Sequence, residues 1–562
     1  MPVYLRAVPV KGVLYWKIVE STRTKKGPRQ KIVKSLGRLT DQEVELYRLW
    51  LKAFPSKEEL SLLVEPSSVH VRTTMLHGGP FLPWSITDEL DLVDLINGIT
   101  EASRSDLDVG KLITAAVINR CVDPVSKSFL VDKWLPKTSL PLLLELDLKE
   151  LHNNAVYRAM DVLLEHKTEL ELALWNVLKS RYGASPNALF YDITSSYFEG
   201  KGPPLARRGY SRDKRPDRPQ VNIGLVITEE GYPITSQLFP GNTLDKTTVE
   251  GTCSRLKEDF LIESCVFVGD CGMITDDNLK TINSHRYNFI ICHKEDHVRE
   301  RLAAVLVLHQ DEWEVVDENL SVLDVEHEGE RFVLCFNTQK VEDDREAREA
   351  FLEKGKALIE EVRDMAVRGT VKDHDKLLRK VVKRLVKAGC DTYFDFEIPP
   401  TPARDLKYWV IKRKVENDAL FDGKWVLQTD VLDRPAADIA RLYKHLSTIE
   451  DMFKTLKGEL EMRPMYHRLD ERVFAHVFIC QLAYLIMEVM ERRARENRLD
   501  MTAPAMVRAF SNVTLNEVTM GPDEGAHVWR VTELDQEQRK IMLALELKKK
   551  DLKSLERVEI TG

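Results

Sequence analysis

The apolar positions of this chain follow two different periods, and the changes between them predict where strands and helices lie. Strand-like apolar runs occur at residues 188–194, 220–228, 234–239, 265–269 and 287–292. Helical spacing lies between them, at residues 246–260 and 276–284. Three strands followed by helix, strand, helix and strand predict a mixed sheet with helices on its faces. The expected fold class is therefore a multidomain α/β protein.

The residues before this sheet have two characters. Residues 3–10 and 13–20 predict a hairpin around Lys11 and Gly12, and a third strand is expected at 31–35 after a basic loop. A helix is expected from Asp41, because Thr40 and Glu43 have the spacing of a capping box. Mainly helical spacing follows, including residues 109–120, 155–166 and 168–181.

Asp270 and Glu450 are 180 positions apart, too far for a simple loop, so this stretch is expected to have structure of its own. A long charged helix is expected within residues 341–389, and a hairpin turn at Asp422 and Gly423. Strand-like runs lie at residues 312–316, 320–326, 331–337, 391–397, 408–413 and 425–428. Helices are expected beyond them, from Tyr443, at 474–492 and around 535–557.

With 562 residues, the chain is too long for one hydrophobic core and is expected to form several domains. The predicted segments are an N-terminal basic β-hairpin segment plus helix (1–65), a helical, DNA-binding domain (66–184), the first part of the sheet core (185–295), a strand-rich insertion domain (296–435), the final helices of the core (436–498) and a C-terminal helical tail (499–562).

Composition narrows the classes of protein that fit. No run of 18 or more apolar residues is evident and no secretory signal is recognisable, so we expect a cytoplasmic protein without a membrane partner. The eight cysteines form no C-x2-C pair, which argues against a zinc site or a disulfide framework.

Charge is segregated along the chain. The net charge of −8 argues mildly against DNA binding. However, residues 1–40 contain ten Lys or Arg and one acid, and residues 207–218 contain six Lys or Arg and two acids. Such basic stretches are typical either of solvated loops or of phosphate-contacting surfaces.

Three acids stand in settings that favour metal chemistry. Asp192 ends one apolar run, Asp270 ends a second, and Glu450 lies on a predicted helix. A single Asp at a strand end is usually a turn or cap residue, but three convergent carboxylates suit a pair of hard divalent cations such as Mg²⁺. Other nearby acids are expected to be solvated, capping or supporting groups: Glu199, Asp245, Asp276, Asp277 and Asp451.

The spacing around Glu450 carries a family resemblance. Tyr443, Leu446, Glu450 and Lys457 have relative offsets of 0, 3, 7 and 14, which would place them on one face of an α-helix. The pattern resembles the Tyr-Arg-Glu-Lys signature of IS4-type DDE transposases, in particular the IS1634-like branch. Leu446 stands where many relatives have Arg. Further similar segments lie at residues 209–220, 239–246, 270–274, 449–457 and 460–467.

The resemblance implies an RNase H-like core in which the first and fourth strands are adjacent, so that Asp192 and Asp270 end side by side. It implies that Asp192, Asp270 and Glu450 are catalytic and hold two Mg²⁺ ions, with Mn²⁺ able to substitute. The implied activity is hydrolysis at the ends of an insertion sequence, followed by transfer of the 3′-OH into target DNA.

The implied partners are double-stranded DNA, as terminal inverted repeats and as target, and a second copy in a homodimer that pairs two ends. The implied location is the cytoplasm, in association with the nucleoid. The DNA-contacting residues expected from the signature and from the basic segment are Tyr443, Lys457, Arg207, Arg208, Arg212, Lys214, Arg215 and Arg218.

Two alternatives stay open at this level. One is a transposase-derived, sequence-specific DNA-binding protein that has lost catalysis, which the intact acids disfavour and the Leu446 departure favours. The other is an RNase H-like nuclease that cuts without joining strands, which the long insertion and the Tyr443 to Lys457 pattern disfavour.

Overall fold

The computed structural model describes residues 3–560 apart from 11–12, 25–26, 54–68, 102–105, 274, 294–301, 303–304, 307–308, 310–311, 372, 399–405 and 521–525. The chain forms two compact units, and each is described by itself. One unit comprises Met1–Leu163 with Leu482–Gly562, and the other comprises Leu164–Gln481. The turn expected at Lys11 and Gly12 lies outside the described residues.

The second unit is built on a nine-stranded sheet with the order β10-β11-β12-β15-β9-β8-β5-β6-β7. The predicted core supplies five of these strands: β5 (Ala188–Tyr197), β6 (Gln220–Thr228), β7 (Pro233–Pro240), β8 (Val266–Gly269) and β9 (Asn288–His293). β5, β6 and β7 are antiparallel, whereas β8 runs parallel to both β5 and β9. The expected mixed sheet, with its first and fourth core strands adjacent, is confirmed.

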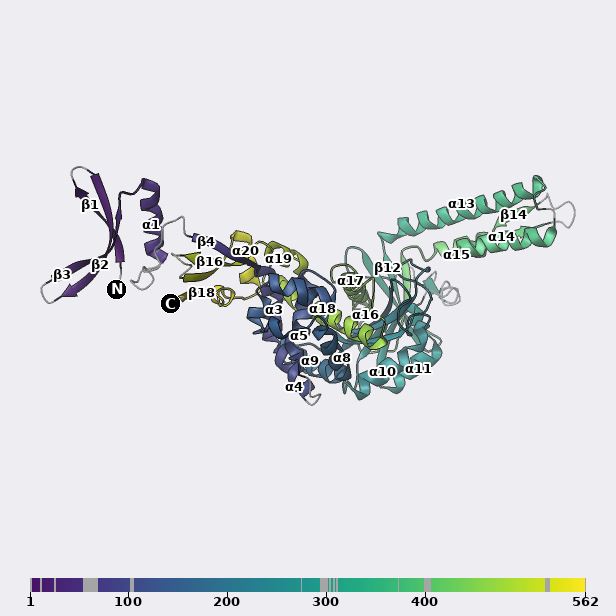
Figure 1. The fold of residues 1–562 in the computed structure, drawn as a ribbon. Coiled ribbons are helices and arrows are strands. Elements are labelled where there is room, and N and C mark those ends of the chain that lie inside the picture. Colours follow the sequence, from purple (N-terminus) through teal and green to yellow (C-terminus); the bar gives the residue numbers. More distant parts are fainter. Residues whose placement is uncertain are drawn as a thin grey trace. The chain divides into compact units, whose positions relative to one another are not determined.

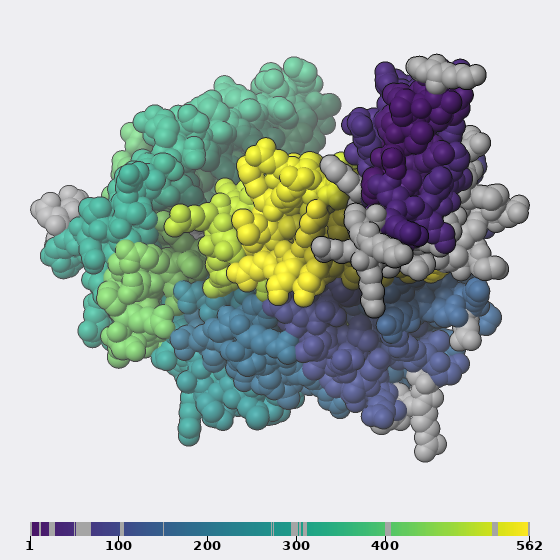
Figure 2. All heavy atoms as spheres, turned by 90° about the vertical axis from the view of Figure 1, so that its left-hand side faces the viewer, coloured from purple at the N-terminus to yellow at the C-terminus, as the bar shows by residue number. Residues whose placement is uncertain are grey.

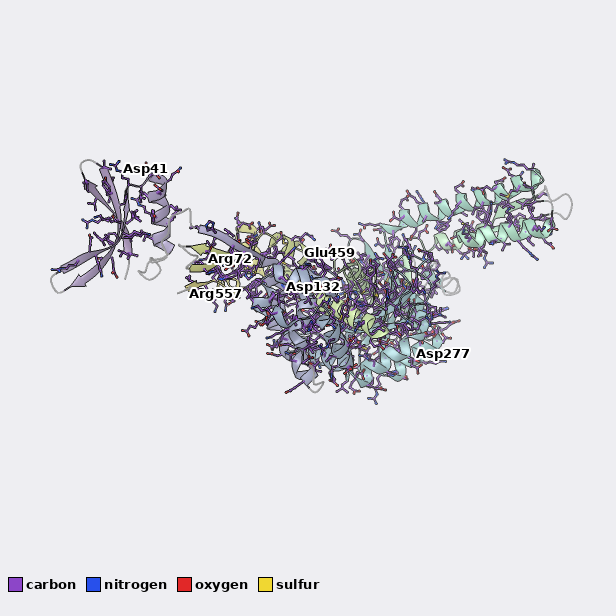
Figure 3. The ribbon with its side chains drawn as sticks, viewed as in Figure 1. Asp41, Arg72, Asp132, Asp277, Glu459 and Arg557 are labelled. Carbon is purple, nitrogen blue, oxygen red and sulfur yellow. The ribbon has the colours of Figure 1, made fainter. Side chains whose placement is uncertain are left out.

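Helices cover this sheet because its strands are apolar on both faces. Every residue of β6 is buried, which is typical of a central strand between two layers. The two expected helices are present as α10 (Val249–Glu258) and α11 (Asp276–Ser284), with Asp277 in the first turn of α11 (Figure 3). A further helix, α9 (Lys167–Tyr182), packs against β7.

Four strands from the predicted insertion extend the same sheet. They are β10 (Glu314–Val315), β11 (Leu320–His327), β12 (Glu330–Asn337) and β15 (Lys424–Thr429). β11 and β12 are joined by Glu328 and Gly329, whose positive φ angles of 54° and 81° suit a tight antiparallel hairpin. β15 pairs with β9, so these strands belong to one sheet with the core.

A helical hairpin lies in sequence between β12 and β15. α13 (Lys340–Val367) and α14 (His374–Ala388) lie side by side, and β13 (Phe394–Glu397) pairs with β14 (Lys407–Val410) (Figure 1). The long charged helix expected within 341–389 is therefore confirmed as α13, and a second helix, α14, follows after the chain reverses near Gly369, which has a φ of 73°.

The hairpin turn expected at Asp422 and Gly423 is also wrong. These residues connect α15 (Lys412–Ala419) to β15, and β14 pairs with β13 rather than with β15. Gly423 does have the positive φ, 68°, that made a turn plausible. Local turn chemistry thus identified the bend but not the elements that it joins.

The last part of this unit is helical. α16 (Ala436–Lys444) and α17 (Leu446–Lys457) are separate helices, and α18 (Asp470–Glu496) follows them, with its residues from Leu482 onward in the first unit. By length and composition α18 could cross a membrane, which corrects the expectation that no such stretch exists. However, 89% of its most apolar window is buried within the protein, as is typical of a core helix.

In the first unit, the N-terminal segment forms the antiparallel sheet β1 (Val3–Val10), β2 (Val13–Thr24) and β3 (Gly27–Gly37), followed by α1 (Asp41–Ala53). The capping box before Asp41 (Figure 3) is confirmed, because the Thr40 N–H donates to Glu43 at 2.7 Å and the Glu43 N–H donates to Thr40 Oγ1 at 3.3 Å. Val3, Ile18, Tyr47 and Leu51 form its small core.

The C-terminal part of this unit contains strands that the sequence patterns did not predict. β16 (Thr514–Met520), β17 (Ala526–Val531) and β18 (Arg557–Ile560) form a four-stranded sheet with β4 (Val69–Leu76). The single helix expected around 535–557 is wrong, since α20 (Gln536–Ala544) and α21 (Lys549–Leu552) are two short helices before β18. Figure 2 shows the C-terminal residues in yellow as one continuous patch of surface.

The remaining helices of this unit include α3 (Gly78–Glu89), α4 (Leu92–Thr100), α5 (Val109–Val122), α8 (Ala155–Glu165) and α19 (Ala503–Ala509). The expected helices at 109–120 and 155–166 are thereby confirmed. In the part of the chain that the structure describes, seven cysteines are buried, as expected of small apolar residues: Cys121, Cys253, Cys265, Cys292, Cys335, Cys390 and Cys480.

Candidate catalytic site

Asp192 and Asp270 lie at the same level of two paired strands, Asp192 within β5 and Asp270 directly after the end of β8. β5 and β8 are parallel with Tyr191 opposite Gly269, and the two acids are the next residues of their chains. β5 continues to Tyr197 and so passes the end of β8, and the parallel register places the two acids on neighbouring chain segments at the point where β8 ends. The tertiary fold therefore brings together two acids that are 78 positions apart in the sequence.

The electrostatic environment of Asp192 favours a bound cation. Burial, together with the negative charges of Asp270 and Asp245, raises the pKa of Asp192 to about 7. The Ile193 N–H, which donates to Asp192 Oδ1 at 2.7 Å, and the charge of Arg212 lower that pKa, but not enough to offset burial. A hard divalent cation binds carboxylate oxygens and relieves the repulsion between neighbouring carboxylates. The residues present therefore fit Mg²⁺.

Glu450 is carried by a helix that packs against the strand of Asp192. α17 contacts β5, and the ring of His445 stacks on Phe190 with their centroids 6.5 Å apart. Ile449 is buried, whereas the Glu450 side chain is exposed. Among the described residues, no three His, Cys, Asp or Glu side chains lie close enough together to hold a metal ion. The structure thus pairs Asp192 with Asp270 and leaves Glu450 outside that cluster.

Asp245 is an acid beside the pair that the sequence patterns did not single out as part of the site. Its Oδ2 accepts a hydrogen bond from Arg212 Nη2 at 2.5 Å, and its negative charge acts on Asp192. A methyl group at Gly272 would lie 3.5 Å from the same oxygen. These residues line a pocket of about 330 Å³, together with Tyr210 and Lys246. The sequence patterns did not identify Asp245, because an acid in the connection between two core strands is not part of a periodic pattern.

The basic segment after β5 is tied to neighbouring acids. Arg215 donates to both carboxylate oxygens of Asp217 at 2.9 and 3.0 Å, and Arg218 lies 3.1 Å from Glu199. Arg207 is held by backbone hydrogen bonds to Gln220 in both directions, at 2.9 Å. Arg208 and Lys214 are exposed. The segment is therefore a shaped loop whose cations have local partners, rather than an extended solvated run.

Lys457 is not the exposed lysine that the helical spacing indicated. Its side chain is 10% exposed, and its Nζ donates to Asp213 Oδ1 at 2.7 Å. Asp213 is 1% exposed and also accepts from Arg463 at 2.5 Å. Burial lowers the pKa of Lys457, although the contact with Asp213 opposes that shift. The end of α17 is thereby joined to the basic segment through one buried carboxylate.

Tyr443 and Leu446 also differ from the expected single helical face. Tyr443 lies near the end of α16, before His445 and the start of α17, so it does not share a helix with Glu450. Leu446 is 7% exposed and packs inward. An apolar residue here is explained by burial at the first position of α17.

The histidines near this site behave as packing and hydrogen-bonding residues. His445 stacks on Phe190, and the rings of His467 and His476 lie 5.1 Å apart. His476 is buried, with its Nε2 3.3 Å from the Met462 carbonyl oxygen.

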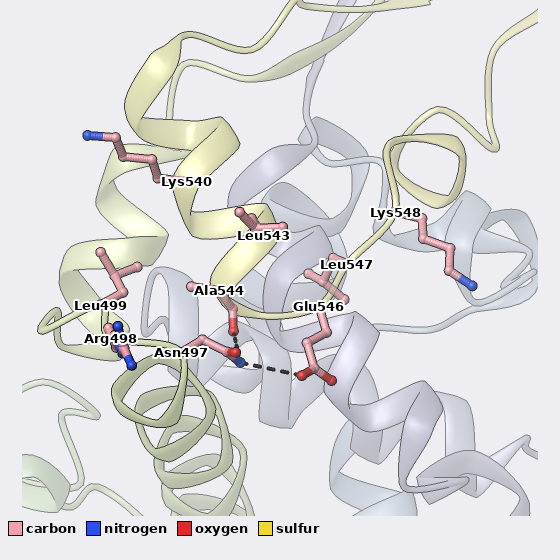
Figure 4. A pocket seen from close by; sticks show the side chains of 9 residues that line it. All are labelled: Asn497, Arg498, Leu499, Lys540, Leu543, Ala544, Glu546, Leu547 and Lys548. Atoms are coloured by element: carbon pink, nitrogen blue, oxygen red, sulfur yellow. Dashed lines mark hydrogen bonds between the residues drawn. The ribbon is translucent and has the colours of Figure 1, made fainter.

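A second pocket, of about 750 Å³, lies in the first unit beside the end of α18 and α20 (Figure 4). Its single acid, Glu546, accepts from Asn497 Nδ2 at 3.4 Å, while Leu543 is 79% exposed. Because it lacks a second carboxylate, this pocket does not offer the ligand set that divalent metal chemistry requires.

Comparison with known families agrees with the fold and the paired acids. The transposase DDE domain family matches residues 184–486, which include Asp192, Asp270 and Glu450. This match covers more than half of the chain, so the protein belongs to the transposase DDE domain family. The N-terminal domain of IS1634 family transposases matches residues 6–60, which identifies the chain as an IS1634-like transposase of an insertion sequence. No match occurs among curated proteins.

Proposed function

We propose that this transposase hydrolyses the phosphodiester at the ends of its insertion sequence and transfers the freed 3′-OH into target DNA. Transposases act on DNA, and DDE domains generally use divalent metals. The observation that carries the proposal is the placement of Asp192, within β5, beside Asp270, at the end of β8, with the pKa of Asp192 raised by burial and by its acidic neighbours.

Asp192, Asp270 and Glu450 would hold two Mg²⁺ ions, for which Mn²⁺ can substitute. When bound, such ions stabilise negative charge on the attacking and leaving oxygens of an in-line displacement. The protein's own contribution is to fix the carboxylates on rigid elements, β5 and the end of β8 for the two aspartates and α17 for Glu450. Glu450 would join the pair through its flexible, exposed side chain.

The DNA is proposed to lie against the basic segment beside the paired acids. Arg208 and Lys214 are exposed there, and Arg212 lines the pocket next to Asp245. Arg207, Arg215 and Arg218 would exchange part of their contacts with local groups for contacts with phosphate, as Arg binds phosphate in a bidentate manner. The half-buried Lys457 and Tyr443 would act at the border of this surface rather than from an open helix face.

The remaining parts of the proposal concern assembly and place. We propose a homodimer that pairs two terminal inverted repeats before cutting, in the cytoplasm and in association with the nucleoid. The basic N-terminal segment, which matches the IS1634 N-terminal domain, is proposed to bind DNA as well.

The test is substitution of each acid. Asp192→Ala, Asp270→Ala and Glu450→Ala should each lower Mg²⁺-dependent cleavage of element-end DNA by about 100-fold or more, because each removes several kcal/mol of charge stabilisation. Binding to the same DNA should stay near that of the wild type. Asp451→Ala, next to Glu450 and exposed, is the matched control and should cleave normally. Near-normal cleavage by any of the three variants removes that residue from the site, and an inactive wild type that still binds DNA supports a DNA-binding protein without catalysis.

A further inference from the structure

The two helices of the hairpin after β12 carry very different charge. α13 has nine acidic and six basic residues, so its net charge is −3. α14 has six basic residues and one acid, Asp375, so its net charge is +5 over 15 residues. The net positive charge of this hairpin therefore lies on α14, although both helices are exposed along much of their length.

The cations of α13 are largely neutralised by acids of the same helix. Arg345 lies 2.5 Å from Glu342, Lys356 lies 2.7 Å from Glu353, and Arg363 lies 3.1 Å from Glu360. These are i, i+3 pairs, the usual arrangement of a solvated charged helix. On α14, Arg384 is paired, through Glu361 of α13 at 2.6 Å.

Four cations of α14 form one exposed face. Lys376, Arg379, Lys383 and Lys387 are all exposed, and none of the four forms an ion pair within the described part of the chain. At 100° per residue they fall within an arc of about 80°, and from first to last they span about 16 Å. That length corresponds to roughly five base-pair steps at about 3.4 Å each.

The opposite face of α14 fixes this orientation. Leu377, Val381 and Leu385 are buried in a core shared with Ile359 and Val362 of α13. Because these residues hold the helix against its partner, the basic face cannot rotate inward to find acids on α13. The fold thus keeps the four cations in solvent, where they repel one another. A helix with mixed charges, such as α13, avoids this repulsion.

We propose that the exposed basic face of α14, formed by Lys376, Arg379, Lys383 and Lys387, is a binding surface for the phosphate backbone of duplex DNA. The inference rests on the proposed function, since it assigns to α14 a share of the DNA that the catalytic edge cuts. It requires no base contact, because lysines on a regular helix bind phosphates without reading sequence. The surface therefore adds affinity for flanking or target DNA rather than specificity.

A competing feature lies next to this face. Leu378, Val382 and Val386 are 38%, 43% and 56% exposed and follow one another at intervals of four residues. An exposed apolar stripe of this kind also suits a protein partner, including a second copy. The charge favours DNA, because five net positive charges on one short helix would repel the same helix of a second copy. The two occupants are separated by experiment.

The experiment uses the full-length protein and a random-sequence DNA duplex, with affinity measured over a range of salt concentrations. In the test variant, Lys376, Arg379, Lys383 and Lys387 are replaced by Gln, which preserves helix propensity. In the control, Lys340, Arg345, Lys354 and Arg363 of α13 are replaced by Gln, which changes the charge of the same hairpin by the same amount. The slope of log K against log salt should fall in magnitude by about two to four in the α14 variant, and by less than about one in the control.

Equal slopes for wild type and α14 variant, or equal losses in both variants, overturn the proposal. An unchanged slope combined with a changed sedimentation coefficient of the DNA-free protein assigns the face to a protein partner instead. A double variant, Lys376→Gln with Lys383→Gln, should give about half of the full effect, and it replaces the quadruple variant if that one melts earlier. Wild-type protein that binds this duplex but does not cleave element ends contradicts the proposed function while leaving the α14 surface supported.

Discussion

At the scale of single residues, burial explains both the raised pKa of Asp192 and the apolar side chain at Leu446. Burial, together with Asp270 and Asp245, raises the pKa of Asp192 by more than the Ile193 N–H and Arg212 lower it. Leu446 stands where an arginine is common in related signatures, and it is 7% exposed. In each case the environment, rather than the residue type, decides what the position does.

The first prediction is that Mg²⁺ binding depends on pH through Asp192. The folded pKa of about 7 lies above the usual value of about 4, so the carboxyl is protonated over much of the acidic range. A cation must displace that proton, so Mg²⁺ affinity should rise as the pH increases toward 7 and level off above it. Calorimetric titration between about pH 5 and 8 measures this, and Asp192→Asn should abolish the dependence.

The raised pKa of Asp192 also makes the stability of the metal-free protein depend on pH. Because the folded pKa is raised, the contribution of Asp192 to the free energy of unfolding is fully present below about pH 4 and is lost as the pH rises through about 7.

Arg212→Gln removes a positive charge that lowers the pKa of Asp192, so it should move the midpoint of Mg²⁺ binding to higher pH. An unchanged midpoint in that variant would show that Arg212 does not act on Asp192.

The second prediction concerns Leu446→Arg. A guanidinium placed at this buried position loses the packing of Leu446 and cannot be solvated, so the free energy of unfolding should fall by about 3 kcal/mol. Ser447→Arg, at the next and exposed position of α17, is the control and should change it by less than about 1 kcal/mol. Denaturant unfolding compares the two, and equal stability would argue against the burial of Leu446.

At the scale of elements, the junction between α17 and the basic segment depends on one buried carboxylate. Asp213 accepts from both Lys457 and Arg463, and its side chain is 1% exposed. A charge buried this deeply is stable only while its partners remain. The position of α17, which carries Glu450, is therefore coupled to the loop that carries Arg212.

The third prediction is that Lys457→Met destabilises the protein as well as impairing cleavage. Removing this lysine leaves Asp213 with Arg463 alone, which should lower the free energy of unfolding by about 1–3 kcal/mol. Lys454→Met is the matched control, because Lys454 lies on the same helix but is exposed and paired with the exposed Asp451. Melting temperature and end cleavage are measured for both. If Lys457→Met cleaves poorly yet melts like the wild type, the lysine acts on DNA rather than through Asp213.

At the scale of the whole molecule, catalysis is proposed to need two copies. The proposed homodimer would pair two element ends, and a closed two-fold arrangement is the commonest way for identical chains to do so. Products that require cutting at both ends should then depend on both protomers being active.

The fourth prediction uses mixtures of wild type and Asp192→Ala. At equal concentrations of each, the amount of product cut at both ends should fall to about one quarter of that made by the same total concentration of wild type. The reason is that about one quarter of randomly formed dimers contain two active copies. Wild type diluted to the same active concentration with buffer is the control. A fall to about one half of the undiluted level, as for independent monomers, would contradict the dimer.

The sequence by itself determined the elements whose signals are local. The structure confirms the apolar runs of β5 to β9, two of which contain or precede Asp192 and Asp270, and the capping box at Thr40, because these signals depend on neighbouring residues. The family pattern around Glu450 is local as well, and the match of the DDE domain to residues 184–486 agrees with it.

Only the tertiary structure decided what depends on contacts between distant segments. The sequence does not show that β15 pairs with β9, or that Asp213 is buried between Lys457 and Arg463. A helical wheel drawn from Tyr443 assumed one continuous helix, whereas the chain breaks near His445. Burial and pairing arise from residues tens to hundreds of positions apart, so the roles of Leu446, Lys457 and Asp245 follow from packing rather than from spacing.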